Sequence, residues 1–250
     1  MYDDICYKKP FLKEVIARVD FSPTIDNIEK SLPPKLSKEL STHFPIAEPA
    51  DTIAQELQVS AEELHHRQTR MKHWNFYGKE RQRHLSLAAP FVFVSYSKYK
   101  SYEDMREHFS AVVDAVGGAF PDTIAIRFGI RYINSIEIPE VIDPSSLSDY
   151  ICASLLGTMP FFEEPKRLSR LVSIAELKYD DVDVRFQFGM PNPDYPAAIK
   201  RQQFVLDFDA YIQESHDISG SIQYMEKAHE RIQSLFEKSI TERLREKMNA

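Results

Sequence analysis

Two arginines and two aspartates have the spacing of a charged site on a β-sheet. Arg127 and Arg131 are four residues apart, and Asp207 and Asp209 are two residues apart. On strands, each pair projects from one face, because side chains alternate with a period of two. Paired arginines could clamp a carboxylate or a phosphate, and paired carboxylates could form a two-carboxylate site or hold a divalent cation. The same residues could instead pair across strands with one another or with Glu14 or Asp20. We favour this structural pairing.

Two polar residues follow Arg131 in the same predicted strand. Asn134 interrupts an apolar row, and a buried asparagine needs partners for its amide. It could bond the sheet backbone at a kink, or it could line a concave surface together with Tyr132. A pocket between sheet and helices would then have six candidate ligand-binding residues. They are Arg127, Arg131, Tyr132, Asn134, Asp207 and Asp209.

A basic and aromatic stretch covers residues 65–84. Its candidate nucleic-acid-binding residues are Arg67, Arg70, Lys72, Trp74, Arg81 and Arg83. Cations bind phosphates and aromatic rings stack on bases, so the composition suits a nucleic-acid surface. A strand with period-two alternation would divide these residues between two faces, one of them buried. We favour a solvated hairpin over a binding surface.

Catalytic and metal-binding motifs are not found in the sequence. It has no nucleophile elbow, no phosphate-binding glycine loop and no zinc-type cysteine spacing. The histidines at 65, 66, 73 and 84 lack nearby Asp or Cys ligands at metal-binding spacing. His229 falls in the apolar stripe of a predicted helix, where a core histidine is the usual finding. The sequence therefore predicts no catalytic residue, no metal and no cofactor, and it disfavours an enzyme.

Composition and charge are ordinary for a globular protein. The chain has 250 residues, 43% hydrophobic residues and a formal net charge of −7. The acidic balance works against non-specific attraction to nucleic acid or anionic membranes. The two cysteines, Cys6 and Cys152, form no disulfide framework, and no apolar run has the roughly 20 residues of a membrane span. A cytoplasmic protein that does not associate with membranes is expected.

The order of predicted elements indicates an α+β fold. An antiparallel sheet, or sheets, with long helices packed on one face explains the many hairpin and meander patterns. Residues 1–121 and residues 122–250 show a similar order of strand, helix, several strands and helix, which suggests two pseudo-duplicated halves packed as one unit. This arrangement is similar to TBP-like and helix-grip folds.

Three predicted elements determine where the candidate residues lie. Residues 85–97 are predicted as one strand in which Pro90 marks a bend, a bulge or an exposed edge. Residues 123–138 are predicted as a long strand in which Ile124 and Ile126 share the apolar face and Gly129 marks a bulge or a bend. A single helix is predicted from about Ser219 to Lys247, spanning roughly 40 Å.

Short segments from one end of the chain to the other carry a resemblance. They are the proline and apolar segment that leads into Glu14-Val-Ile, Arg127-Phe-Gly-Ile-Arg-Tyr-Ile-Asn134, Phe204-Val-Leu-Asp-Phe-Asp209 and Phe236-Glu-Lys-Ser-Ile-Thr241. With them the chain resembles a sporadically distributed prokaryotic family of uncharacterised proteins of about 250 residues. Pro10-Phe11-Leu12 departs from that family's more usual proline-proline-isoleucine start. The resemblance implies no activity, cofactor or catalytic residue. By analogy, its patchy distribution suggests a link to mobile elements or defence.

Three functions remain open from the sequence. The first is a non-enzymatic binding or interaction protein of a prokaryotic cytoplasm, acting as a homodimer or with a protein partner. The second is a nucleic-acid-binding protein that uses residues 65–84. The third is a small-molecule binder or hydrolase with a pocket around Arg127, Arg131, Asp207 and Asp209.

Overall fold

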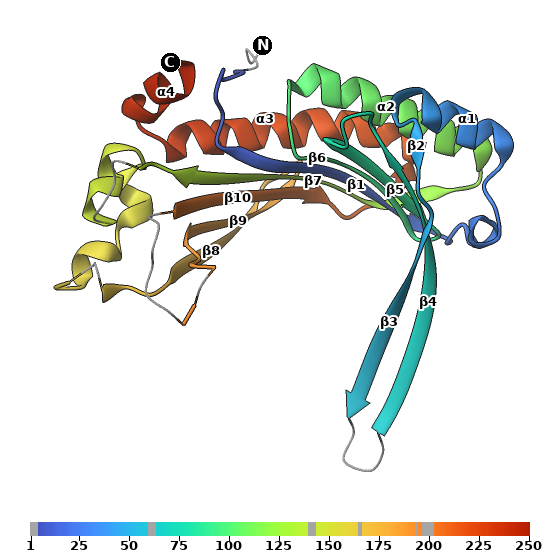
Figure 1. The fold of residues 1–250 in the computed structure, drawn as a ribbon, viewed down its shortest axis with the longest axis horizontal. Helices are drawn as coiled ribbons and strands as arrows, with labels where there is room; N and C mark the ends of the chain where they lie inside the picture. Colours follow the sequence, from blue (N-terminus) through green and yellow to red (C-terminus); the bar gives the residue numbers. More distant parts are fainter. Residues whose placement is uncertain (1–4, 60–63, 140–143, 165–166, 194, 197–202) are drawn as a thin grey trace.

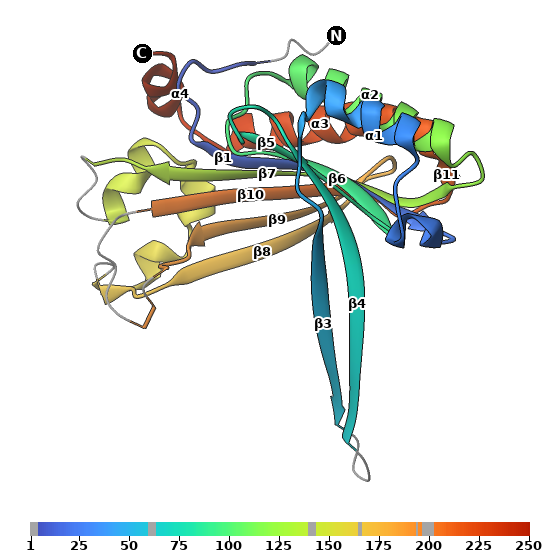
Figure 2. The same ribbon diagram turned by 45° about the vertical axis from the view of Figure 1, so that its right-hand side comes forward.

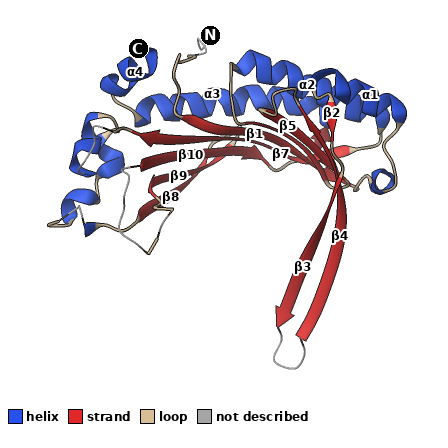
Figure 3. Ribbon diagram, viewed as in Figure 1, coloured by secondary structure: helices blue, strands red, loops and turns tan. Residues whose placement is uncertain are grey.

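A computed structural model describes most of the chain. It covers residues 5–59, 64–139, 144–164, 167–193, 195–196 and 203–250, with the backbone alone at 53–59, 64–70, 144–145 and 160. The expected fold class is confirmed, because helices and an antiparallel sheet are both present in quantity (Figure 3). No helix among the described residues has both the length and the apolar character of a membrane span.

Strands in the described residues form one open sheet. The long ones are β1 (Leu12–Ser22), β3 (Ala50–Val59), β4 (Leu64–Tyr77), β5 (Arg83–Ala88), β6 (Phe91–Tyr96), β7 (Ile124–Glu137), β8 (Leu171–Lys178), β9 (Asp183–Met190) and β10 (Gln203–Ile212). Two short strands, β2 (Ile46–Ala47) and β11 (His216–Asp217), pair with β4 and β7. The order across the sheet is β2-β4-β5-β6-β1-β7-β10-β9-β8, and β3 pairs with β4 away from this path.

Helices cover one face of the sheet and leave the other face open (Figures 1 and 2). They are α1 (Pro34–His43), α2 (Tyr102–Ala119), α3 (Ser221–Ser239) and α4 (Glu242–Asn249). The core lies between them and the sheet. In β1, for example, Val15, Ala17 and Val19 are fully buried, whereas the alternating residues Ile16 and Arg18 are only partly covered. The period of two in the sequence thus determines which side chains the helices cover.

The two halves of the chain meet at the centre of the sheet. β1 of residues 1–121 pairs with β7 of residues 122–250, and each strand is followed outward by three long antiparallel strands. On one side these are β6, β5 and β4, and on the other they are β10, β9 and β8. A helix follows each set, α2 in the first half and α3 in the second. This correspondence agrees with the expected similarity in element order.

A two-stranded arm belongs to the first half alone. β3 and the first part of β4 pair from Ala50 opposite His73 to Val59 opposite Leu64. The arm extends away from the body of the sheet in both views (Figures 1 and 2). The last part of β4, from Trp74 to Tyr77, returns to the sheet and pairs with β5.

The prediction of a single helix over residues 219–247 is wrong. α3 ends at Ser239 and α4 begins at Glu242, with Ile240 in an extended conformation between them. Backbone bonds to residues 150–152 replace the helical ones here: Cys152 N–H donates to Ser239 O at 2.9 Å, and Thr241 N–H donates to Tyr150 O at 3.0 Å. Each helix also spans less than the predicted length.

Residues 85–97 form two strands and not one. β5 and β6 are a hairpin that reverses at Ala89 and Pro90, with Ala88 opposite Phe91. Pro90 lies in the turn, where its missing N–H removes no bond from the ladder.

The bulge in β7 lies nearer its start than Gly129. The register with β1 shifts between Asp20, opposite Arg127, and Phe21, opposite Ala125, so that Ile126 is the extra residue. Because of this shift, Ile124 and Ile126 leave the apolar row and are exposed, contrary to the sequence prediction.

Candidate functional site

The charged residues predicted as a clamp lie together on the open face of the sheet. Arg131 and Asp207 form a two-point ion pair, with Nε to Oδ1 at 2.7 Å and Nη2 to Oδ2 at 2.6 Å. Arg127 lies between two carboxylates, 3.6 Å from Asp20 and 3.6 Å from Asp209. Burial, more than any other cause, raises the pKa of Asp209. Each cation thus has an intramolecular partner, which agrees with the structural pairing that we favoured.

Tyr132 and Asn134 lie on the opposite face of the same strand. Both are buried beneath α3, whereas Arg131 is on the open face. The six predicted ligand-binding residues are therefore divided between two surfaces, four on the open face and two on the helix-covered face. No single pocket contains all six.

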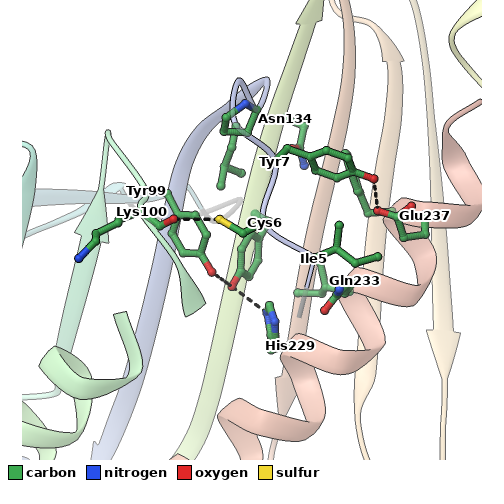
Figure 4. A pocket seen from close by; sticks show the side chains of 14 residues that line it. Ile5, Cys6, Tyr7, Tyr99, Lys100, Asn134, His229, Gln233 and Glu237 are labelled. Carbon is green, nitrogen blue, oxygen red and sulfur yellow. Dashed lines mark hydrogen bonds between the residues drawn. The ribbon is translucent and has the colours of Figure 1, made fainter. Parts of the chain in front are cut away.

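Tyr132 and Asn134 instead line a pocket between the sheet and α3. The N-terminal segment, residues 5–10, crosses its mouth, and the loop with Tyr99 and Lys100 closes one side (Figure 4). Apolar walls come from Leu12, Ile232 and Phe236. The volume is about 90 Å³. This volume limits the pocket to a small ligand unless the N-terminal segment moves outward.

Three hydroxyl and imidazole groups form a chain of hydrogen bonds in this pocket. The Tyr99 and Tyr132 hydroxyl oxygens are 3.3 Å apart, and the Tyr132 oxygen is 3.0 Å from His229 Nδ1. The ring of Tyr102 stacks on His229 with centroids 3.9 Å apart and a 5° angle between planes. These contacts fix the orientation of the imidazole. The resulting network offers both hydrogen-bond donors and hydrogen-bond acceptors.

Two buried carboxamides complete the polar lining. Asn134 is 6% exposed and Gln233 is 8% exposed, and both belong to the pocket wall. Asn134 Nδ2 donates to Leu206 O at 3.4 Å, which ties the side chain to the neighbouring strand. The sequence offered two roles for Asn134, a hydrogen bond to the sheet backbone and a place in the lining of a concave surface. Asn134 has both roles in the structure.

The N-terminal segment is attached to the body on both sides of the mouth. Tyr7 donates to Glu237 Oε1 at 2.7 Å, and Cys6 Sγ donates to Lys100 O at 3.1 Å (Figure 4). Burial, together with the bond to Glu237, raises the pKa of Tyr7, so its hydroxyl stays protonated as a donor. Glu237 also accepts from Arg245 Nε at 2.8 Å. Its charge is therefore compensated outside the pocket.

This lining suits a small neutral ligand with an apolar body. Amide, hydroxyl and imidazole groups can each fix one polar atom of a ligand, while the walls bury its apolar part. The described residues contain no group of three or more His, Cys, Asp or Glu side chains placed to hold a metal ion. The side chains of His65 and His66 lie outside that description.

The candidate nucleic-acid residues do not form one surface where they are described. Lys72 Nζ lies 4.4 Å from the ring centroid of Trp74, whose Nε1 donates to Ile28 O at 2.7 Å. Arg81 pairs with Glu48, and Arg83 contacts His108 on the helix side. The side chains of two further candidates, Arg67 and Arg70, lie outside the described residues.

The sequence prediction missed most of the pocket. Tyr7, Tyr99 and Gln233 were not singled out, and His229 was interpreted as a core residue. One signal was present: His229, Gln233 and Glu237 recur every four residues on the face of α3 that carries its apolar stripe. Polar residues at that spacing indicate a polar strip beneath the helix. The contribution of residues 5–10 and of the 99–100 loop depends on contacts over long separations in the chain.

No protein-family model matches this sequence, and no curated protein matches it either. The resemblance to a prokaryotic family therefore remains a prediction.

Proposed function

We propose that this chain is a non-enzymatic binding protein whose ligand is a small neutral molecule with an apolar body. The supporting observation is that four buried polar side chains line one pocket whose walls are largely apolar. They are Tyr132, Asn134, His229 and Gln233. Buried polar groups are costly unless they are hydrogen-bonded, and gathering several of them at a pocket is typical of a recognition site.

Cys6 gives a direct readout of whether the pocket is occupied. It lines the mouth and is exposed, whereas Cys152 is partly buried elsewhere. We expect 4-methylphenol or benzamide to slow alkylation of Cys6 by iodoacetamide at least threefold, measured by mass spectrometry. The rate at Cys152 should not change. Equal protection of both cysteines, or of neither, would contradict the proposal.

A pocket-filling variant separates specific from general effects. Leu12→Trp places a larger side chain against the pocket wall from β1, and it should remove the protection of Cys6 by either probe. Leu171→Trp is the matched control, because Leu171 is also partly buried but lies on β8, away from the pocket. Protection retained in Leu12→Trp would place the probes elsewhere.

A second role, assembly into a homodimer, is favoured by the edge strand β8. Among the described residues, β8 pairs only with β9, so its other edge presents unpaired backbone groups. Val172 and Ile174 are exposed on the open face of this strand. We infer that two copies of the chain pair through β8, in antiparallel fashion about a two-fold axis.

The sequence of β8 is complementary to itself in one register. With Ser173 opposite its own copy, Val172 faces Ile174 of the second chain, and Arg170 faces Glu176. Arg170 and Glu176 are both exposed, so two opposite-charge pairs would flank two apolar pairs on one face. Symmetric pairing of this kind is self-complementary, as a two-fold interface requires.

Charge reversal tests that register. Arg170→Glu should convert a dimer into a monomer in analytical ultracentrifugation, and adding Glu176→Arg should restore the dimer. The control is Ile126→Lys, which changes an exposed apolar residue of β7 and should leave the mass unchanged. A wild-type monomer at 100 μM, or a double variant that stays monomeric, would contradict this assembly.

A further inference from the structure

Arg83 occupies an unusual environment at the start of β5. Its side chain lies across Gly78, where a Cβ atom would fall 2.6 Å from the Arg83 Cγ. The guanidinium carbon is 5.7 Å from the centroid of the Phe44 ring, and Nη1 donates to His108 Nε2 at 3.2 Å. The glycine therefore makes room for an arginine that is held against the body of the protein.

Arg83 forms no ion pair with any residue that the structure describes. Among the residues that the structure describes, none places a carboxylate oxygen within 4.0 Å of its guanidinium, and its Nε is buried without a hydrogen-bond partner. Other arginines differ, since these four donate to a carboxylate: Arg18, Arg106, Arg131 and Arg245. A partly buried cation without a counter-charge is costly, and an anion would relieve that cost.

The contact with His108 leaves a further donor at the same place. A guanidinium can only donate, so His108 Nε2 accepts and the proton of the neutral imidazole is on Nδ1. Nδ1 is 3.0 Å from the Tyr96 oxygen, which therefore accepts. Burial, followed by the charge of Arg83, lowers the pKa of His108, and this favours the neutral imidazole. In the part of the chain that the structure describes, no residue accepts the Tyr96 hydroxyl proton, so this proton can bond an oxygen of a ligand.

The surroundings of Arg83 form an open depression with an excess of positive charge. Its charged lining residues are Lys79, Arg83, Lys98 and Lys100, against Glu80 and Asp104. This excess contrasts with the net charge of −7 on the whole chain. The depression also lies at the N-terminal end of α2, where Ser101 is the N-cap and the helix dipole favours negative charge.

We propose that this depression is an oxyanion-binding site, in which the Arg83 guanidinium and the Tyr96 hydroxyl hold a carboxylate or phosphate group. The lysines of the rim raise the local concentration of anions, and Arg83 gives the specific contact. This site is separate from the proposed neutral-ligand pocket, although Tyr99 and Lys100 line both.

Inorganic phosphate and acetate are suitable probes. Each is titrated into the wild-type protein at pH 7.5 and at an ionic strength held constant with sodium chloride, while NMR follows the Nε–Hε signal of Arg83. We expect a saturable shift of that signal. A stronger response to phosphate would indicate a phosphate ligand, and an equal response would show that a carboxylate suffices. An unmoved Arg83 signal would overturn the proposal, and so would the same response to chloride.

Variants then test which residue binds the anion. Arg83→Gln should weaken phosphate binding at least tenfold, whereas the neighbouring Arg81→Gln, which loses an exposed pair with Glu48, should not change it. Gly78→Ala is a second variant that keeps every charge, and it should also weaken binding because the new Cβ displaces the Arg83 side chain. Wild-type affinity in folded Arg83→Gln or Gly78→Ala protein would contradict the assignment.

Discussion

The Tyr132 hydroxyl lies 3.0 Å from His229 Nδ1, although the two residues are 97 positions apart in the chain. This bond joins the central strand β7 to α3 inside the pocket. It converts a histidine in an apolar helix stripe into a member of a polar network with Tyr99 and Tyr102. The same contact stabilises the packing of α3 on the sheet and shapes the surface that a ligand would meet.

Removing the Tyr132 hydroxyl should cost stability. Tyr132→Phe leaves His229 Nδ1 without this partner, so we expect the free energy of unfolding to fall by about 1–3 kcal/mol in urea titrations. The matched control is Tyr150→Phe, since Tyr150 is similarly buried and its hydroxyl makes no hydrogen bond to any described residue. If both variants lost the same free energy of unfolding, the hydrogen bond between Tyr132 and His229 would have no special role in stability.

The open-face pair should matter for stability and not for ligand binding. Arg131→Leu leaves the buried Asp207 carboxylate without its two-point partner, and we expect a loss of about 2 kcal/mol in the free energy of unfolding. Arg243→Leu breaks an exposed pair with Asp149 and should cost less than about 1 kcal/mol.

Probe binding gives the second readout for the same variant. Because Arg131 lies on the face opposite the pocket, 4-methylphenol should still protect Cys6 in Arg131→Leu. Loss of that protection in a folded variant would instead support a ligand site on the open face.

Stability should fall as the pH is lowered below about 6.5. Burial is the main cause that lowers the pKa of His73, His84 and His108 below the ordinary histidine value of 6.5. Below pH 6.5 the unfolded chain binds more protons than the folded chain, so protonation of these histidines favours unfolding. Above pH 6.5 the histidines are neutral in both states, and their contribution to stability is fully present. Urea titrations between pH 8 and pH 5.5 measure the effect, and His84→Gln should reduce its slope. A free energy of unfolding that is constant or rises on acidification contradicts this prediction.

Gly189 should not tolerate a side chain. Its φ is +132°, and a Cβ atom there would lie 2.2 Å from Leu171 O in the adjacent strand. We expect Gly189→Ala to lower the free energy of unfolding by about 2 kcal/mol or more, because backbone strain and this close contact add. Gly118→Ala is the control, since a Cβ there meets nothing within 4 Å and alanine favours the helix. Equal unfolding midpoints for Gly189→Ala and the wild-type protein would exclude strain at this position.

The sequence was sufficient to predict the fold class, because alternation in β1 and β7 and the stripes of α2 and α3 follow the rules of each element. The hairpin at Pro90 and the break at Ile240 were not predicted, since each depends on partners distant in the sequence. Ile240, for instance, pairs with Ile151 in an isolated bridge. Only a small part of the pocket was predicted: Tyr132 and Asn134 were identified, but the alternation that places them beneath the helix also separates them from Arg127 and Arg131.

The most direct test of the central claim follows the side-chain amides of Asn134 and Gln233 by NMR while 4-methylphenol and benzamide are titrated in. Both amides line the proposed pocket and are buried there. We predict saturable shifts at both amides for at least one probe, and none in Leu12→Trp. Shifts confined to residues outside the pocket, or no saturable shift with either probe, would contradict the proposal that this chain binds a small neutral ligand there.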